Sequence, residues 1–238
     1  MLASAHAWRR WRRRPDVNAV SIIQAAPIAL SQRLHALQAA TAAPLEFLTQ
    51  SEWARRRGDP SIADFVVGNP HEMPLEGFVS ALRRHVEPHS SDWFAYKMSE
   101  PAAQDSIASA LSNQFGGERF APADVLLTTG AFAGLTVVLK TIVDAGDEVL
   151  FVSPPWFFYA ALIVAEGGVP VRVCARADDF DLDLTAIEAA ITPRTRAIIL
   201  NSPNNPTGRI YPPRTLAGIA KVLTRASQRH GHDSRKMS

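Results

Sequence analysis

The stretch Asn201-Ser202-Pro203-Asn204-Asn205-Pro206-Thr207-Gly208 follows an apolar run, Ala197-Ile198-Ile199-Leu200, and precedes a helical pattern that begins near Pro212. A short apolar run bounded by Pro, Asn and Gly predicts a buried strand that ends in a tight loop. In open α/β sheets, ligands bind outside the carboxyl ends of the strands, where such a loop lies. The asparagine amides can present fixed hydrogen-bonding groups there, although Asn, Pro and Gly are also ordinary turn residues.

Strand and helix patterns alternate along the chain before this loop. Such alternation is typical of βαβ units with right-handed crossovers, and it predicts an α/β fold with a mainly parallel sheet. Further strands are expected at 125–129, 149–152 and 169–173, with helices at 131–143, at 158–166 and directly after a capping residue, Asp183 or Thr185.

The first half of the chain has a mainly helical pattern. Pro44 is expected to end the first helix there, because proline lacks the N–H group that a helix interior needs. The expected helices are 31–43, 45–57, 75–85 and 101–115, and a short strand is expected at 62–67, before Gly68-Asn69-Pro70.

The composition is that of a globular protein, with 238 residues, 47% hydrophobic and 20% charged. The small basic excess comes from an arginine cluster between Arg9 and Arg14, so the folded part gives no support for a nucleic-acid partner. No apolar run reaches about eighteen residues, which argues against a membrane span. The single cysteine, Cys174, excludes an intrachain disulfide and favours a reducing compartment, so we expect a cytoplasmic location.

Two further segments that follow predicted strands carry candidate binding residues. Thr128-Thr129-Gly130-Ala131-Phe132 joins a strand to a helix, and the N–H groups at a helix start suit a phosphate, although plain turns of this kind are common. Trp156 follows two prolines directly after another strand. A tryptophan on such a rigid loop either packs into the core or lays its face on a flat heteroaromatic ring.

Other polar clusters favour structural roles. His230 and His232 have no further ligands nearby in sequence, so we expect a solvated tail and no metal site. Asn201 and Asn204 are expected to be turn residues. The acidic run Asp178, Asp179, Asp181 and Asp183 is expected to be a polar loop before a helix.

Over roughly residues 60 to 228, the chain resembles the class I/II aminotransferases, enzymes of fold type I that use pyridoxal 5′-phosphate. The stretch Asn201–Gly208 is similar to their N-P-x-N-P-T-G signature. The segment Ser153-Pro154-Pro155-Trp156-Phe157-Phe158-Tyr159 is similar to their S-P-x-W/Y-x-x-Y segment. The resemblance implies the large domain of fold type I, a mainly parallel sheet flanked by helices, which is incomplete at the C-terminus of this chain.

The resemblance also implies roles for individual residues in binding pyridoxal 5′-phosphate. The turn at Gly130, with the backbone N–H groups of Ala131 and Phe132, would hold the cofactor phosphate. Trp156 would stack on the pyridine ring. Asn205 would donate its amide N–H to the ring oxygen O3′. Phe132 departs from the family pattern, because many relatives carry a polar side chain in this turn.

Tyr96 occupies the place of a family tyrosine that reaches the cofactor phosphate of the partner subunit, which implies a homodimer. Pro101 stands where many relatives have glycine, which changes the turn after Tyr96. The implied domains are a disordered basic tail over 1–18, an N-terminal arm with part of a small domain over 19–70, and a truncated cofactor-binding large domain over 71–238.

Catalysis with this cofactor requires a Schiff-base lysine and an acid against the pyridine nitrogen. The family carries both after the N-P-T-G loop, in D-x-x-Y and S-x-x-K segments. None of the lysines of this chain lies in S-x-x-K, so we expect the chain to lack both catalytic residues and to be inactive by itself. These lysines are Lys97, Lys140, Lys221 and Lys236.

The implied function is transfer of an amino group between an amino acid and a 2-oxo acid. Two alternatives remain open. The first is a lyase or decarboxylase of the same fold, since fold does not determine reaction type. The second is a non-catalytic remnant, or a split subunit that needs a partner chain.

Overall fold

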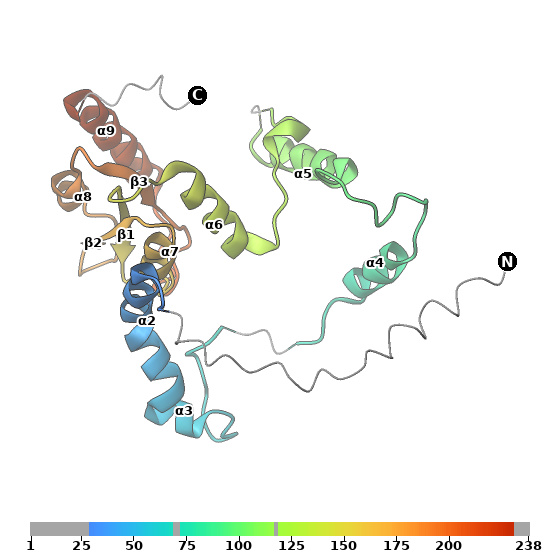
Figure 1. The fold of residues 1–238 in the computed structure, drawn as a ribbon, viewed down its shortest axis with the longest axis horizontal. Coiled ribbons are helices and arrows are strands. Elements are labelled where there is room, and N and C mark those ends of the chain that lie inside the picture. The colour runs from blue at the N-terminus through green and yellow to red at the C-terminus, as the bar shows by residue number, and fades with distance from the viewer. Residues whose placement is uncertain (1–28, 69–71, 117–118, 231–238) are drawn as a thin grey trace, which may run out of the picture.

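The computed structural model describes residues 29–68, 72–116 and 119–230, and a parallel sheet lies at its centre. Strand β1 (Glu148–Ser153) lies between β2 (Val169–Cys174) and β3 (Thr195–Ile199), and it pairs parallel with both. The sheet order β2-β1-β3 results from helical crossovers between successive strands (Figure 1). The predicted α/β class and the parallel sheet are confirmed.

Helices precede, connect and follow these strands. Within the described ranges, no helix is both long enough and apolar enough to cross a membrane. The helices are α2 (Gln32–Gln50), α3 (Glu52–Arg56), α4 (Glu76–Val86), α5 (Pro101–Gln114), the 3-10 turn η1 (Pro122–Asp124), α6 (Gly130–Ile142), α7 (Tyr159–Ala165), α8 (Leu184–Ala190) and α9 (Pro213–His230).

Strand β1 is buried on both faces. Alternate side chains of a strand point to opposite sides of the sheet, and helices cover β1 on both sides. Leu150 and Val152 pack on the side of α8 and α9, in a cluster that includes the fully buried Ile187. Val149 and Phe151 pack on the side of α6 and α7. The sheet therefore has two separate apolar layers, one for each pair of helices.

The pairing of β1 with β3 contains a one-residue irregularity. Glu148 lies opposite Thr195, but Val149 lies opposite Ala197, so Arg196 is left out of the pairing. The exposed Arg196 side chain instead donates from Nε to the carbonyl of Ile142 at the end of α6, at 2.7 Å. The bulge thus leaves Arg196 outside the strand pairing and lets its side chain reach the end of α6.

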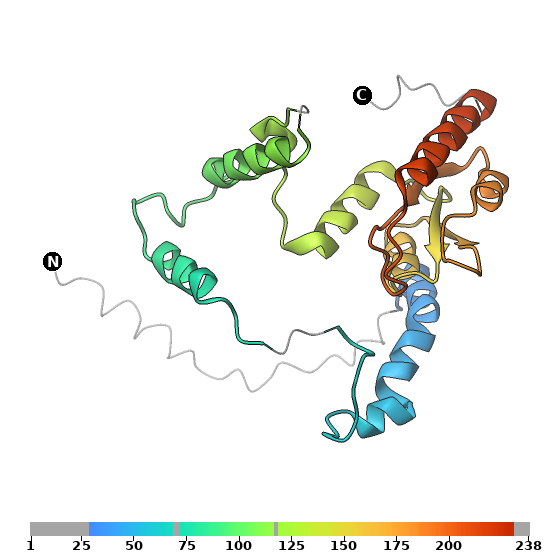
Figure 2. The same cartoon turned by 180° about the vertical axis from the view of Figure 1, so that it is seen from behind.

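Figure 1 and Figure 2 both show that the chain leaves this central body after α3 and returns with α6. Helices α4 and α5 stand apart from the sheet in both views, whereas α2 lies against α7. On α4, the apolar side chains Phe78, Leu82 and Val86 are exposed. The proposed domain division at residue 70 stays a prediction.

Two predicted strands are wrong. Residues 125–129 form no strand, because both backbone groups of Val125 have other partners: its N–H donates to the Pro122 carbonyl, and its carbonyl accepts from the Gln104 side chain. Residues 62–67 form no strand either. There, the Asp64 carboxylate accepts the N–H of Val66, and such side-chain bonds compete with strand pairing.

The prediction that Pro44 ends the first helix is also wrong, because α2 continues through it to Gln50. Alanines before Pro44 favour helix strongly, which offsets the loss of one backbone hydrogen bond. The expected cap of α8 is confirmed for Asp183, whose carboxylate accepts the N–H of Ala186 at 2.9 Å. The alternative cap, Thr185, lies inside the helix.

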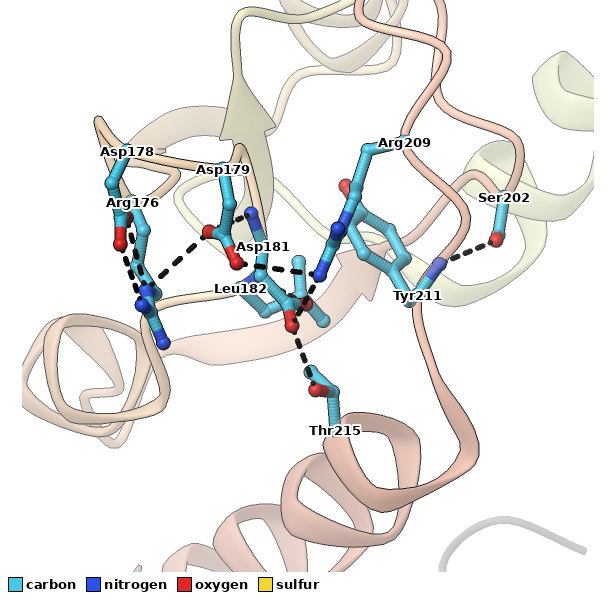
Figure 3. A network of polar contacts seen from close by, with 9 residues as sticks. All are labelled: Arg176, Asp178, Asp179, Asp181, Leu182, Ser202, Arg209, Tyr211 and Thr215. Carbon is cyan, nitrogen blue, oxygen red and sulfur yellow. Dashed lines mark hydrogen bonds and ion pairs between the residues drawn. The ribbon is translucent and has the colours of Figure 1, made fainter.

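A buried carboxylate connects three segments below the Asn201–Gly208 loop (Figure 3). Asp181 is 4% exposed and accepts hydrogen bonds from the Leu182 N–H at 2.9 Å, from Arg209 Nη2 at 2.9 Å and from the Thr215 hydroxyl at 3.1 Å. Burial raises the pKa of Asp181, but these three donors outweigh it and hold the pKa below its ordinary value. The acidic run is therefore more than the polar loop that the sequence predicts.

A second buried carboxylate lies at the amino ends of β1 and β3. Glu148, at the start of β1, is 5% exposed and accepts the Thr192 hydroxyl at 2.6 Å, and it forms an ion pair with Arg194. The hydrogen bond from Thr192 and the charge of Arg194 keep the pKa of Glu148 below its ordinary value, against the effect of burial. The amino ends of β1 and β3 are thereby joined through side chains.

Truncation of the core is expected to destabilise the sheet. Ile187→Ala empties a fully buried position between α8 and β1, and we expect it to lower the free energy of unfolding by about 2–5 kcal/mol. Urea denaturation followed by circular dichroism measures this loss. The control Ile210→Ala removes the same atoms from a side chain that is 67% exposed. Equal losses in the two variants would contradict the assignment of the core.

Asp181→Asn is expected to destabilise the chain in a pH-dependent way. At pH 7 we expect a loss of about 1.5–3 kcal/mol, because Arg209 and Thr215 lose a charged acceptor. Since the native pKa of Asp181 is lowered, its contribution is complete above the unfolded pKa of about 3.9 and is lost as the pH falls through the native pKa.

Urea denaturation at pH 7 and at about pH 3 tests this pH dependence, and the difference from the wild type should shrink at the lower pH. The exposed Asp105 on α5 provides the control variant Asp105→Asn, which should change stability by less than about 0.5 kcal/mol. A loss in Asp181→Asn that stayed constant with pH would mean that the Asp181 charge is not the cause.

Candidate functional site

The first turn of α6 has the features of an anion site. Gly130 begins the helix with φ of +80°, a conformation that favours glycine. The helix has no side-chain cap, whereas Ser31 caps α2 and Asp183 caps α8. The N–H groups of Ala131 and Phe132 lie in this first turn, where no preceding helical carbonyl is available to them. Together with the helix dipole, they suit a phosphate.

Trp156 lies directly beside this turn. Its ring centroid is 5.7 Å from that of Phe132, and the two planes meet at 83°. Phe158 and Tyr159 also contact the indole, with centroids 5.1 Å and 5.5 Å away. Edge-to-face contacts of this kind fix the orientation of an aromatic ring. The half-buried Trp156 thus has a defined plane next to the start of α6.

The loop after β3 is joined to the loop that carries Trp156. The Asn204 amide donates from Nδ2 to the Pro154 carbonyl at 3.2 Å and to the Thr207 hydroxyl at 3.0 Å. Asn204 is 7% exposed, whereas the neighbouring Asn205 is exposed. The loop therefore turns one asparagine inward and leaves the other accessible to a ligand.

The structure connects five of the six predicted site residues through contacts between neighbouring loops. Gly130, Ala131 and Phe132 form one turn, Phe132 contacts Trp156, and the Asn204–Pro154 bond joins the Asn205 loop to the Trp156 loop. Tyr96 is not part of this group: it lies in the segment between α4 and α5 and is fully exposed.

The lysines in the described residues lie elsewhere. Lys97 forms an ion pair with Glu100 at 2.9 Å, and Lys140 and Lys221 are exposed on α6 and α9. Lys236 lies outside the described residues, as do the N-terminal arginine cluster and His232. Within the described ranges, no group of three or more His, Cys, Asp or Glu side chains is arranged to hold a metal ion.

Two buried tyrosines underlie the site. Burial raises the pKa of the Tyr159 hydroxyl, whose ring packs against Phe151 and Trp156. Burial, followed by the nearby Asp181 charge, raises the pKa of Tyr211, whose backbone N–H donates to the Ser202 hydroxyl at 3.0 Å. Both phenols therefore stay neutral at ordinary pH and serve as packing groups.

The sequence does not predict the supporting role of three residues near the site. The sequence predicts a turn role for Asn204 and a polar loop for Asp181, and it predicts no role for Arg209. Arg209 holds the exit of the loop, because its carbonyl accepts the Asn204 N–H at 2.9 Å while its guanidinium bonds Asp181. An arginine directly after the loop and a run of aspartates before it together indicate a possible ion pair in the sequence.

The donor set suits one kind of ligand. Helix N–H groups fit a phosphate, an oriented indole fits a flat aromatic ring, and an accessible amide fits a polar substituent of that ring. A Cβ atom built on Gly130 would meet no atom within 4 Å, so the space above the turn is open. A phosphorylated heteroaromatic compound combines these three features.

The family model for aminotransferase class I and II matches residues 62–229. The aspartate/prephenate aminotransferase of Thermus thermophilus is 33% identical over 172 residues, which cover 71% of this chain and 43% of that protein. The aspartate/prephenate aminotransferase of Cereibacter sphaeroides is 41% identical over 113 residues, which cover 47% of this chain and 28% of that protein.

Solved structures show the same relationship. A single mutant of Thermus thermophilus aspartate aminotransferase matches with a TM-score of 0.64 and 30% identity, over 85% of this chain and 51% of that one. An aminotransferase of Eubacterium rectale matches with a TM-score of 0.68 and 25% identity, over 86% of this chain and 50% of that one.

This chain thus spans less than half the length of these curated relatives and about half the length of these solved structures. The family model nevertheless matches the larger part of the chain, including the turn at Gly130, Trp156 and the Asn205 loop. The chain belongs to the family of class I and II aminotransferases.

Proposed function

We propose that this chain supplies the pyridoxal 5′-phosphate contacts of an enzyme that transfers an amino group between an amino acid and a 2-oxo acid. The observation that supports this is the chain of contacts from the first turn of α6, through Phe132 and Trp156, to the loop that carries Asn205. The names of the relatives, among them aspartate/prephenate aminotransferases, support the same class of reaction.

Each residue has a distinct part in the proposed site. The N–H groups of Ala131 and Phe132 bind the phosphate, and Gly130 gives the turn its conformation. Trp156 orients the pyridine ring by stacking, and it excludes water from that face. Asn205 donates its amide N–H to the ring oxygen, and it does so without taking up a proton.

When bound, pyridoxal phosphate supplies an aldehyde that receives the amino group and a ring that withdraws electrons from the substrate carbon. The overall exchange is balanced: one amino acid becomes a 2-oxo acid, and a second 2-oxo acid becomes an amino acid. The lysine and the ring-nitrogen acid that this chemistry needs are proposed to be absent from this chain, so amino transfer requires residues that it does not contain.

The remaining parts of the proposal concern the assembly. We assign Tyr96 to the cofactor phosphate of a partner subunit in a homodimer, for which its exposed position leaves room. We retain the division into a basic tail over 1–18, an arm with part of a small domain over 19–70, and a large domain over 71–238. A cytoplasmic location accords with the single cysteine, Cys174.

Binding of a cofactor analogue tests the site directly in this chain. The probe is 4′-deoxypyridoxine 5′-phosphate, which keeps the phosphate, ring and phenolic oxygen but has no aldehyde, so it needs no lysine. We expect saturable binding by isothermal titration calorimetry. Trp156→Leu should raise the Kd about tenfold or more, because base–aromatic stacking contributes about 1–3 kcal/mol.

The matched control for this substitution is Trp53→Leu. Trp53 stacks on Phe47 at 5.6 Å and donates to Asp64, in the part of the chain that contains α3. It should leave the Kd unchanged within about twofold. No measurable binding by the wild-type chain, or equal weakening by both tryptophan variants, would contradict the proposed cofactor site.

The coding DNA beyond codon 238 tests the reaction type. We expect D-x-x-Y and S-x-x-K segments in one of its three frames, and amino transfer from aspartate to 2-oxoglutarate by the protein that includes them. The product glutamate is measured by coupled oxidation. If no frame encodes these segments, the alternative of a non-catalytic remnant or a split subunit gains support over an aminotransferase.

A further inference from the structure

We propose that Asn204 is a positioning residue: its side chain joins the loop of Asn205 to the loop of Trp156, so that the amide and the indole keep a fixed spacing around one ligand. This inference rests on the proposed function, because it concerns the same cofactor site. It assigns a role to a residue whose sequence context predicts only a turn.

The first observation is the burial and bonding of Asn204. Its side chain is among the few buried polar ones, at 7% exposed, and both hydrogens of Nδ2 are used, toward the Pro154 carbonyl and the Thr207 hydroxyl. One of these bonds is local, over three residues, whereas the other spans fifty. Turn formation explains the local bond and leaves the long-range bond to Pro154 unexplained.

The turn itself closes through the backbone. The Asn204 N–H donates to the Arg209 carbonyl at 2.9 Å, and the Asn204 carbonyl accepts the Gly208 N–H at 2.7 Å. Any residue except proline can make these two bonds in that backbone conformation. The asparagine side chain is therefore free to act between loops, and its specific requirement is the donor toward Pro154.

The place of this bond in the sheet is the second observation. Pairing between β1 and β3 extends to Phe151 opposite Ile199, near the carboxyl ends of both strands. Beyond it the two chains leave the sheet as loops, and the Asn204–Pro154 bond joins them there. Pro154 lies two positions before Trp156, and Asn204 directly precedes Asn205. A displacement of either loop therefore changes the spacing between the indole and the amide.

The Asp181 network acts on the other side of the same loop. Arg209 Nη2 donates to Asp181 at 2.9 Å, so the exit of the loop is held against the β2–α8 connection (Figure 3). Asn204 and Arg209 thus hold the loop at two points, one toward Trp156 and one toward the core. Asn205 lies between these points and has an exposed side chain.

The test uses Asn204→Asp in the full 238-residue chain. Aspartate has nearly the same shape, but its carboxylate cannot donate to the Pro154 carbonyl. With 4′-deoxypyridoxine 5′-phosphate as the probe, we expect the Kd to rise about tenfold. The double variant Asn204→Asp/Asn205→Ala should bind more tightly than the product of the two single effects predicts, because part of the Asn204 effect acts through Asn205.

A spectroscopic readout separates positioning from a general loss of stability. The phenol of the bound probe ionises with a change in ultraviolet absorption, and a well-placed amide donor favours the ionised form. We expect its apparent pKa to rise by about half a unit in Asn204→Asp and in Asn205→Ala.

The control is Thr192→Val, which removes the Thr192–Glu148 hydrogen bond, another long-range side-chain bond, at the amino ends of the same strands. It should change neither the Kd nor the absorption titration, whatever its effect on stability. If Asn204→Asp keeps the wild-type Kd and the wild-type titration, the proposal is wrong.

Amide hydrogen exchange tests the positioning role without any ligand. In Asn204→Asp we expect faster exchange in the peptide that covers residues 154–159, although the substitution is fifty residues away along the chain. Unchanged exchange there would overturn the proposal. If the wild-type chain binds no probe but the exchange changes as expected, the cofactor function fails while the link between the two loops stands.

Discussion

The structure depends on the burial of one strand. β1 is paired on both edges and covered on both faces. Its backbone groups are hydrogen-bonded only if β2 and β3 stay in place. Its side chains are shielded from water only if α6, α7, α8 and α9 stay in place. Each loop of the candidate site continues from this arrangement. Trp156 follows β1, Asn205 follows β3, and the first turn of α6 lies against the ring of Trp156.

Buried charged side chains fix the positions of the loops and strand ends more closely than apolar packing alone does. The two apolar layers set the distance between helices and sheet, but a leucine can shift along a surface at small cost. Asp181 and Glu148 cannot shift in this way, because a buried carboxylate that loses its hydrogen-bond donors raises the free energy of the folded state. One lies under the loops at the carboxyl ends of the strands, and the other joins the amino ends. The sheet is thus fixed at both ends by side chains that occupy little of the core.

Local pattern was sufficient for much of the fold. The apolar runs of β1, β2 and β3 and the periodicity of α6 to α9 are encoded within single segments, as is the Asp183 cap. One error lies where a distant partner decides. Residues 125–129 have a strand pattern, but a strand needs a neighbour, and Gln104 takes the carbonyl of Val125 instead. The other two errors have local causes: the Asp64 side chain accepts the N–H of Val66, and α2 continues through Pro44 after a run of alanines.

The residues of the candidate site also fall into those that local sequence indicates and those that only the fold identifies. The roles proposed for Trp156 and Asn205 come from resemblance, and pattern alone leaves a plain turn as an alternative for each. The supporting residues could not be found this way. Among four aspartates in one run, only the fold selects Asp181 as the partner of Arg209, and only the approach of two loops gives Asn204 a second partner.

The bulge at Arg196 has a consequence for which sequence changes this architecture can accept. Because Arg196 is skipped in the pairing, Ala197 and Ile199 face the layer of α6 and α7, while Ile198 and Leu200 face that of α8 and α9. Deletion of Arg196 would only remove the bulge, because Ala197 already lies opposite Val149 and every later side chain of β3 would keep its face. Deletion of Ile198, with the bulge in place, would instead move the rest of β3 and the start of the Asn201–Gly208 loop to the opposite face. β3 can therefore lose the residue at its bulge without a change of faces, whereas the loss of a paired residue between the bulge and the loop moves the side chains that follow from one apolar layer to the other.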